Sequence, residues 1–105
     1  MGSLLVLTTC ETVAAAEQLA GVLVGQRLAA CVNALGGVSS TYRWEGRIER
    51  AQEVLLLIKT DEQHFEAIEQ MIKARSSYEL PEVLAVRIHN GSADYLRWLA
   101  GSLAD

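Results

Sequence analysis

The side chains in this sequence that are best suited to bind a metal ion are two cysteines and two histidines, namely Cys10, Cys31, His64 and His89. A thiolate is a soft ligand that suits Cu(I), so Cys31 is the candidate metal ligand; the alternative is a small buried core residue. Cys10 lies beside a predicted helix N-terminus, where the helix dipole would lower the pKa of a thiol; the alternative is an incidental loop thiol. The histidines lie on different predicted elements at no ligand spacing, and we expect both to be solvated.

A second set of side chains combines aromatic rings with opposite charges. Its members are Tyr42, Trp44, Lys59, Tyr78, Glu82 and Trp98. Lys59 ends a strand that we expect to be buried, so its ammonium group either reaches solvent or pairs with a carboxylate. Glu82 is the expected partner, because the turn at residues 78–82 precedes another strand of the same sheet. The set is either an interfacial ion pair flanked by packing aromatic rings or a ligand site.

Catalytic chemistry has little support in the sequence. An enzyme needs a nucleophile with a base, or a pair of carboxylates, and neither Ser76 nor Ser77 has a histidine or aspartate nearby in the sequence. Gly36 and Gly37 fall within a predicted strand and lack the context of a phosphate-binding G-x-G-x-x-G loop. We therefore expect a protein that is not an enzyme.

Composition restricts the partners and the compartment. The chain has 105 residues, of which 50% are hydrophobic, and a formal net charge of -4. This length is enough for one domain, and an acidic chain without a basic run is not expected to bind nucleic acid. No apolar stretch approaches the roughly 20 residues of a membrane span, and no signal-peptide pattern follows Met1. Two cysteines do not form a secreted disulfide framework, so we expect a cytoplasmic protein.

The stretch from Leu28 to Thr60, which contains Cys31, Tyr42, Trp44 and Lys59, predicts one long β-hairpin. Its first arm runs from Ala30 to Glu45, Glu45 and Gly46 turn the chain, and the second arm runs from Arg47 to Thr60. Both arms exceed the roughly 5–6 residues of a common strand, so the hairpin is expected to extend beyond its own sheet. Because an overhanging strand leaves backbone groups unpaired, the sequence predicts self-association. Gly36 and Gly37 predict a bulge in the first arm.

The remaining pattern completes a β-α-β, β-α-β, α order. The expected elements are a strand from Ser3 to Thr9, a helix opening at Glu11 and Thr12, a helix begun by the capping-box pattern Thr60-Asp61-Glu62-Gln63, a strand from Val83 to His89 and a last helix capped by Ser92. This order predicts an α+β, ferredoxin-like split βαβ sandwich with a four-stranded antiparallel sheet. Helices would cover one face of the sheet, and an apolar open face would be an interface.

Five stretches of the sequence together resemble one known family. They are LAACVN (28–33), STYRWEGRIE (40–49), EVLLLIKT (53–60), YELPE (78–82) and YLRWL (95–99). In order and spacing they closely resemble the CutA family, the divalent-cation tolerance proteins, from Leu5 to about Leu103. The resemblance implies a single CutA-like domain over residues 1–105 and a compact homotrimer similar to the PII signalling proteins, in which the hairpins cross between subunits.

The resemblance also implies a non-catalytic role in tolerance of, or response to, divalent metal ions, with copper as the candidate bound ion. Here the sequence departs from the family pattern. Many family members have the motif His-Pro-Tyr-Glu-x-Pro-Glu, and this chain has Ser76 and Ser77 in place of its histidine and first proline. Arg75 stands where some members have a preceding histidine, and Thr8 stands where some have a cysteine. A guanidinium group does not ligate cations, and a serine hydroxyl is a poor copper ligand. The family's copper site is therefore not expected here, which leaves Cys31.

Two other functions remain open alternatives. PII-like trimers use their intersubunit clefts for ligands, so the resemblance also implies a sensor that binds a small anion or a nucleotide in such a cleft. The cleft would be lined by the aromatic and charged set together with Cys31. The other alternative is a structural or anchoring trimer.

Overall fold

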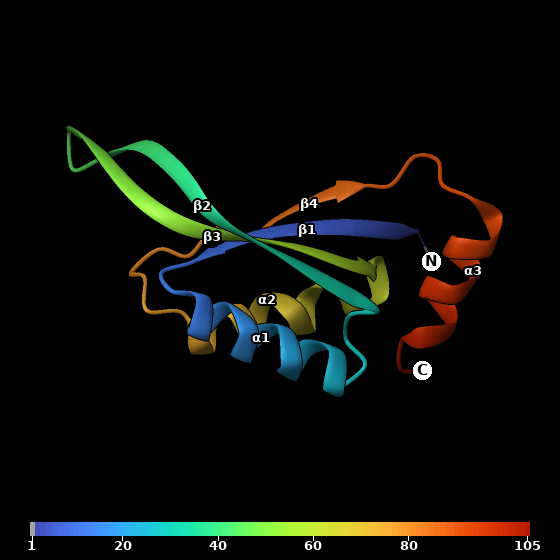
Figure 1. Ribbon diagram of the computed structural model, residues 1–105. Coiled ribbons are helices and arrows are strands. Elements are labelled where there is room, and N and C mark those ends of the chain that lie inside the picture. Colours follow the sequence, from blue (N-terminus) through green and yellow to red (C-terminus); the bar gives the residue numbers. More distant parts are fainter. Residues whose placement is uncertain (1) are drawn as a thin grey trace.

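A computed structural model describes residues 2–105 of the chain, and Figure 1 shows their arrangement. The elements are β1 (Ser3–Cys10), α1 (Val13–Gly25), β2 (Cys31–Trp44), β3 (Arg47–Asp61), the 3-10 turn η1 (Glu62–His64), α2 (Phe65–Arg75), β4 (Leu84–Arg87) and α3 (Ala93–Ser102). Within residues 2–105, no helix has the length and apolar character needed to cross a membrane.

The four strands form one antiparallel sheet in the order β2-β3-β1-β4. Each of α1 and α2 connects two parallel strands that have a third strand between them, and right-handed crossovers place both helices on the same face of the sheet. Figure 1 shows α1 and α2 beneath the sheet and α3 beyond one end of it. The predicted α+β, ferredoxin-like fold is confirmed.

The core lies between the sheet and the two covering helices. Alternate residues of β1 and β3 point into this space. The largest fully buried apolar side chains of this layer are Val6, Leu23, Leu56, Ile58, Ile68 and Ile72. A second, smaller cluster packs under α3 and consists of Ala30, Leu99 and Leu103. Since each large apolar side chain contributes roughly 1.5–3 kcal/mol when fully buried, the first cluster holds the sheet and both helices together as one rigid support.

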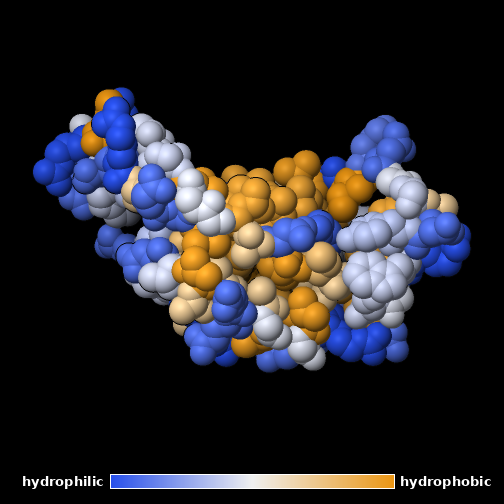
Figure 2. Space-filling model, in the orientation of Figure 1, coloured by the Kyte–Doolittle hydropathy of each residue, from blue (hydrophilic) through white to orange (hydrophobic). Residues whose placement is uncertain are grey.

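The opposite face of the sheet, which we call the open face, is also apolar. Its apolar residues are Leu5, Leu7, Leu35, Leu55, Leu57, Leu84 and Val86. No helix of residues 2–105 covers this face (Figure 1), and Leu84 and Val86 are 56% and 52% exposed. Figure 2 shows hydrophobic surface in the middle of the molecule, beside a hydrophilic hairpin tip. The open face predicted from the element order is therefore present.

The β2–β3 hairpin extends well beyond the sheet. Strand β3 pairs with β1 only from Val54 to Asp61, so residues 47–53 have β2 as their sole partner within residues 2–105. The register shifts between Leu35 and Val38, so the ladder is interrupted at the glycine pair where a bulge or bend was predicted. Glu45 and Gly46 form the turn with φ angles of 50° and 79°, which suit the twist of a hairpin. The molecule is elongated as a result, with extents of 44 × 25 × 22 Å.

The predicted cap at Ser92 is confirmed, the helix expected to open at Glu11 and Thr12 is capped by Thr12, and the predicted cap at Thr60 is wrong. The hydroxyl groups of Thr12 and Ser92 accept hydrogen bonds from the first turns of α1 and α3. Thr60, however, remains in β3 and donates its hydroxyl hydrogen to the carbonyl oxygen of Leu28 at 2.7 Å. Asp61 caps η1 instead, because its carboxylate accepts from the backbone N–H of His64 at 3.1 Å. An extended strand that continues to Asp61 moves the cap one residue along.

The last strand is shorter than predicted. Strand β4 spans Leu84–Arg87 rather than Val83 to His89, and it pairs only with β1 over four residues. At its far end the backbone N–H of Ile88 still donates to Ser3, the first residue of β1. Strand β4 ends there because β1 offers it no further partner.

Candidate functional site

The hydrogen-bonded pair of Tyr78 and Glu53 lies at the base of the projecting hairpin. The Tyr78 hydroxyl donates to Oε2 of Glu53 at 2.6 Å. Burial alone would raise the pKa of Glu53, but hydrogen bonds from Ser40, Tyr78 and Thr9 outweigh it and lower the pKa below its ordinary value. Burial, and then the hydrogen bond to Glu53, raises the pKa of Tyr78 well above its ordinary value. Glu53 is therefore an ionised carboxylate surrounded by neutral donors.

An open groove of about 680 Å³ runs alongside this pair, under the hairpin. Four members of the predicted aromatic and charged set line it: Tyr42, Trp44, Tyr78 and Glu82. The structure thus brings together the outer part of β2 and the loop that precedes β4. The groove also contains the carboxylates of Glu53 and Glu79, so acidic groups outnumber the single guanidinium of Arg43.

Lys59 lies away from this groove. Its ammonium group contacts Oδ1 of Asn33 and lies 3.7 Å from Sγ of Cys31, directly across the β2–β3 ladder. Within residues 2–105 it forms no ion pair with Glu82. The expected Lys59–Glu82 pair is thus not formed within one chain, and a meeting of the two residues between chains stays a prediction.

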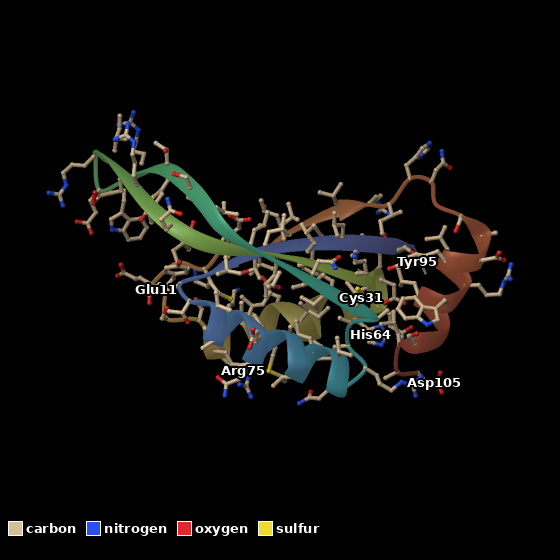
Figure 3. All side chains as sticks on the ribbon, in the orientation of Figure 1. Glu11, Cys31, His64, Arg75, Tyr95 and Asp105 are labelled. Atoms are coloured by element: carbon tan, nitrogen blue, oxygen red, sulfur yellow. The ribbon has the colours of Figure 1, made fainter. Side chains whose placement is uncertain are left out.

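Trp98 lies on α3, apart from the groove, and its ring packs against Tyr95 with centroids 5.3 Å apart. Both rings are about half exposed, Trp98 at 49% and Tyr95 at 44%. Figure 3 shows Cys31 near the α3 end of the molecule, whereas Glu11 lies toward the hairpin end. The predicted site residues therefore fall into two groups, one at each end of the open face.

The positions at which the chain departs from the motif of the resemblance line a cavity of about 80 Å³ that adjoins the groove, since Thr9, Ser77 and Tyr78 line both. Thr8, Cys10, Arg75 and Ser76 all line it. Within residues 2–105 no cluster of three or more histidine, cysteine, aspartate or glutamate side chains is placed to hold a metal ion. Thr8 and Ser76 offer only poor hydroxyl ligands and Arg75 a guanidinium that does not ligate copper, which leaves the Cys10 thiol and the Glu11 carboxylate. The lining therefore does not reproduce the copper site that the resemblance implies.

One alternative considered for Cys10 is ruled out, and the expectation that both histidines are solvated is wrong for His64. Burial, and then the nearby charge of Glu53, raises the pKa of the Cys10 thiol rather than lowering it, because desolvation opposes the thiolate. His64 is buried, not solvated: Nδ1 lies 2.6 Å from Oδ1 of Asp61 and Nε2 lies 2.8 Å from the carbonyl oxygen of Ala104. His89 is exposed, as expected.

Glu53 is the residue that the sequence analysis missed. The sequence does contain a signal for it: Glu53 shares one face of β3 with Leu55, Leu57 and Lys59, so a carboxylate begins an otherwise apolar strand face. A carboxylate at the start of an otherwise apolar face needs a partner. The partner that the structure supplies, Tyr78, lies 25 residues away in the sequence, and no local pattern connects the two.

The fold and the site together define a class of protein: a ferredoxin-like domain with an open apolar sheet face, a projecting hairpin and an acidic, aromatic groove at the hairpin's base. The family model described as the CutA1 divalent ion tolerance protein matches residues 4–102. The chain belongs to this family, as its motifs predicted.

Relatives and solved structures agree with the family. The divalent-cation tolerance protein CutA of Yersinia pestis is 42% identical over 96% of this chain and 85% of its own length. The chloroplastic protein CutA 1 of rice is 41% identical over 95% of this chain, which spans only 56% of that protein. The crystal structure of rice CutA1 superposes with a TM-score of 0.96 at 39% identity, over 100% of this chain and 96% of that one. A structure from Archaeoglobus fulgidus, described as a periplasmic divalent cation tolerance protein, has a TM-score of 0.92 at 32% identity, over 95% of this chain and 97% of that one.

Proposed function

We propose that this chain acts as a non-catalytic homotrimer in tolerance of, or response to, divalent metal ions, copper among them. The observation that carries the proposal is the open face with its overhanging hairpin. Seven apolar side chains lie on this face, and a monomer would leave them in water, which is unfavourable by roughly 25 cal/mol per Å². The outer edge of β2 also presents unpaired backbone groups. Copies of the same chain satisfy both requirements.

Sedimentation equilibrium at micromolar concentration tests the assembly. We expect a single species of three times the chain's mass of 11.4 kDa. A charged substitution in the middle of the open face, Leu57→Asp, should give monomers, whereas the exposed change Val13→Ala on α1 should leave the trimer intact. A monomeric wild type would contradict the proposal.

Growth in the presence of copper tests the role. Cells that lack their own CutA protein should tolerate more copper when they express this chain, and the Leu57→Asp variant should not restore tolerance. Equal tolerance with and without the chain would contradict the metal-tolerance role while leaving the trimer untouched.

A second candidate function is a PII-like sensor with its ligand in clefts between subunits. The observation in its favour is the groove of about 680 Å³ with the rings of Tyr42, Trp44 and Tyr78 along it. A small anion or a nucleotide would need Lys59 from another chain, because the groove's own chain contributes mainly carboxylates. A thermal-shift screen of metals, nucleotides and small anions tests this, since a ligand that binds the native state raises the melting temperature. A trimer that no ligand stabilises would favour the structural or anchoring role.

We also propose a cytoplasmic location. Its support is that Cys10 and Cys31 both remain free thiols, which suits a reducing compartment. Fractionation of cells that express the chain tests this, and recovery of the chain in the periplasmic fraction would contradict it.

A further inference from the structure

Two charges on β3 lack an oppositely charged partner within residues 2–105. The described residues form three lysine or arginine ion pairs and one contact between His64 and Asp61, and neither Lys59 nor Glu53 belongs to any of them. Lys59 contacts only the amide oxygen of Asn33 and the sulfur of Cys31. Glu53 contacts only neutral donors, of which Tyr78 is at 2.6 Å. Half-buried charges without a counter-ion are costly, so both ends of the strand are electrostatically incomplete.

The two charges lie on the same face of the sheet but at opposite ends of its apolar part. Both occupy odd positions of β3, which face away from the helices, with Leu55 and Leu57 between them. Six residues of extended strand separate them by about 20 Å, so they cannot meet within one chain. The open face is therefore polarised, with a cationic end near α3 and an anionic end under the hairpin.

A face that is apolar in the middle and oppositely charged at its two ends is complementary to a second copy of itself packed head to tail. Head-to-tail contacts generate a closed ring when the rotation between copies allows it. We propose that in the homotrimer, on which this inference rests, Lys59 of each subunit forms an ion pair with Glu53 of the next. Each site is then incomplete in one chain and completed three times in the ring.

Glu53 is a better partner for this lysine than Glu82. A buried ion pair is favourable only when further hydrogen bonds satisfy the remaining lone pairs, and Glu53 already accepts hydrogen bonds from Tyr78, Ser40 and Thr9. These donors hold its carboxylate in position before a partner arrives. Glu82 is exposed and has no such support. Lys59 of the aromatic and charged set therefore serves in an intersubunit ion pair, with Glu53 in place of Glu82.

A double-mutant cycle tests the pair. The variants are Glu53→Gln, Lys59→Met and the two combined, and the matched control is Glu82→Gln alone and combined with Lys59→Met. Glutamine at position 53 still accepts a hydrogen bond from Tyr78, and far-UV circular dichroism verifies the fold of each variant. The measurement is the dissociation constant of the trimer by sedimentation equilibrium, in urea if the wild type does not dissociate in buffer.

We expect each single change at Glu53 or Lys59 to raise the dissociation constant by about tenfold or more, because it leaves the other charge buried and unpaired. The dissociation constant of the double variant should be no larger than that of the single variant with the larger value. Glu82→Gln should leave the dissociation constant unchanged, both alone and when it is combined with Lys59→Met. Three outcomes would overturn the ion pair while the homotrimer stands. They are additive effects of the changes at positions 53 and 59, no effect of either change, and coupling of Lys59 to Glu82 instead. A monomeric wild type would refute both.

Discussion

The hydroxyl group of Tyr78 donates a hydrogen bond to Oε2 of Glu53 at 2.6 Å, across 25 residues of sequence. The bond ties the loop after α2 to the point where the hairpin leaves the sheet. It keeps the tyrosine protonated and the glutamate ionised. The same contact therefore orients the hairpin and places a negative charge at one end of the open face.

Removing this hydroxyl should destabilise the chain. We expect Tyr78→Phe to lower the free energy of unfolding by roughly 1–3 kcal/mol, because a carboxylate loses a charge-assisted donor. Urea denaturation measures the change. Tyr42→Phe is the matched control, since its hydroxyl has no hydrogen bond within residues 2–105, and it should have almost no effect. Equal effects of the two substitutions would contradict this role of Tyr78.

Acid should weaken the same contact. The folded-state pKa of Glu53 is lowered from its ordinary value of 4.5, so its ionised form stabilises the fold. This contribution is fully present above pH 4.5 and is lost as the pH falls through the lower folded-state pKa. The measurement compares unfolding of the wild type and Glu53→Gln as a function of pH. The difference between them should be constant near neutrality and shrink on acidification; a difference that grows in acid would have the wrong sign.

Cu(II) should bind weakly to this chain. The cavity at the motif positions is lined by Thr8, Arg75 and Ser76, none of which is a good copper ligand. Its thiol, Cys10, has a pKa that burial raises, which disfavours the thiolate that copper binds. Isothermal titration calorimetry should show no tight stoichiometric site in the wild type. The matched gain-of-binding variant, Thr8→Cys with Arg75→His and Ser76→His, should bind copper tightly, because the three positions line one cavity. Tight binding by the wild type that survives both Cys31→Ala and Cys10→Ala would contradict the prediction.

His64 should hold the segment that follows α3. Its ring nitrogens contact Asp61 and the carbonyl oxygen of Ala104, and the backbone N–H of Ala104 donates to Arg27. We expect His64→Gln to cost roughly 1–3 kcal/mol and to speed hydrogen exchange at Ala104. The exposed change His89→Gln should do neither. Unchanged exchange at Ala104 in the His64 variant would show that Arg27 alone holds the segment.

Strand, helix and turn signals with local causes were predictable. The alternation along β3, the glycine pair in β2, the helix start at Thr12 and the capping hydroxyl group of Ser92 each depend on residues only a few positions apart. Their placement in the structure is therefore as predicted. The cap at Asp61 and the short β4 were mispredicted because each depends on how far a neighbouring strand extends.

By itself, the sequence determined the element order, the long hairpin, the family and the loss of the copper ligands, because these depend on which residues occupy which positions along the chain. Only the tertiary structure decided which side chains meet. It joined Tyr78 to Glu53, separated Lys59 from Glu82, raised the pKa of the Cys10 thiol and buried His64. Distances between remote residues and the solvation of each group arise from packing, and packing is absent from any local pattern.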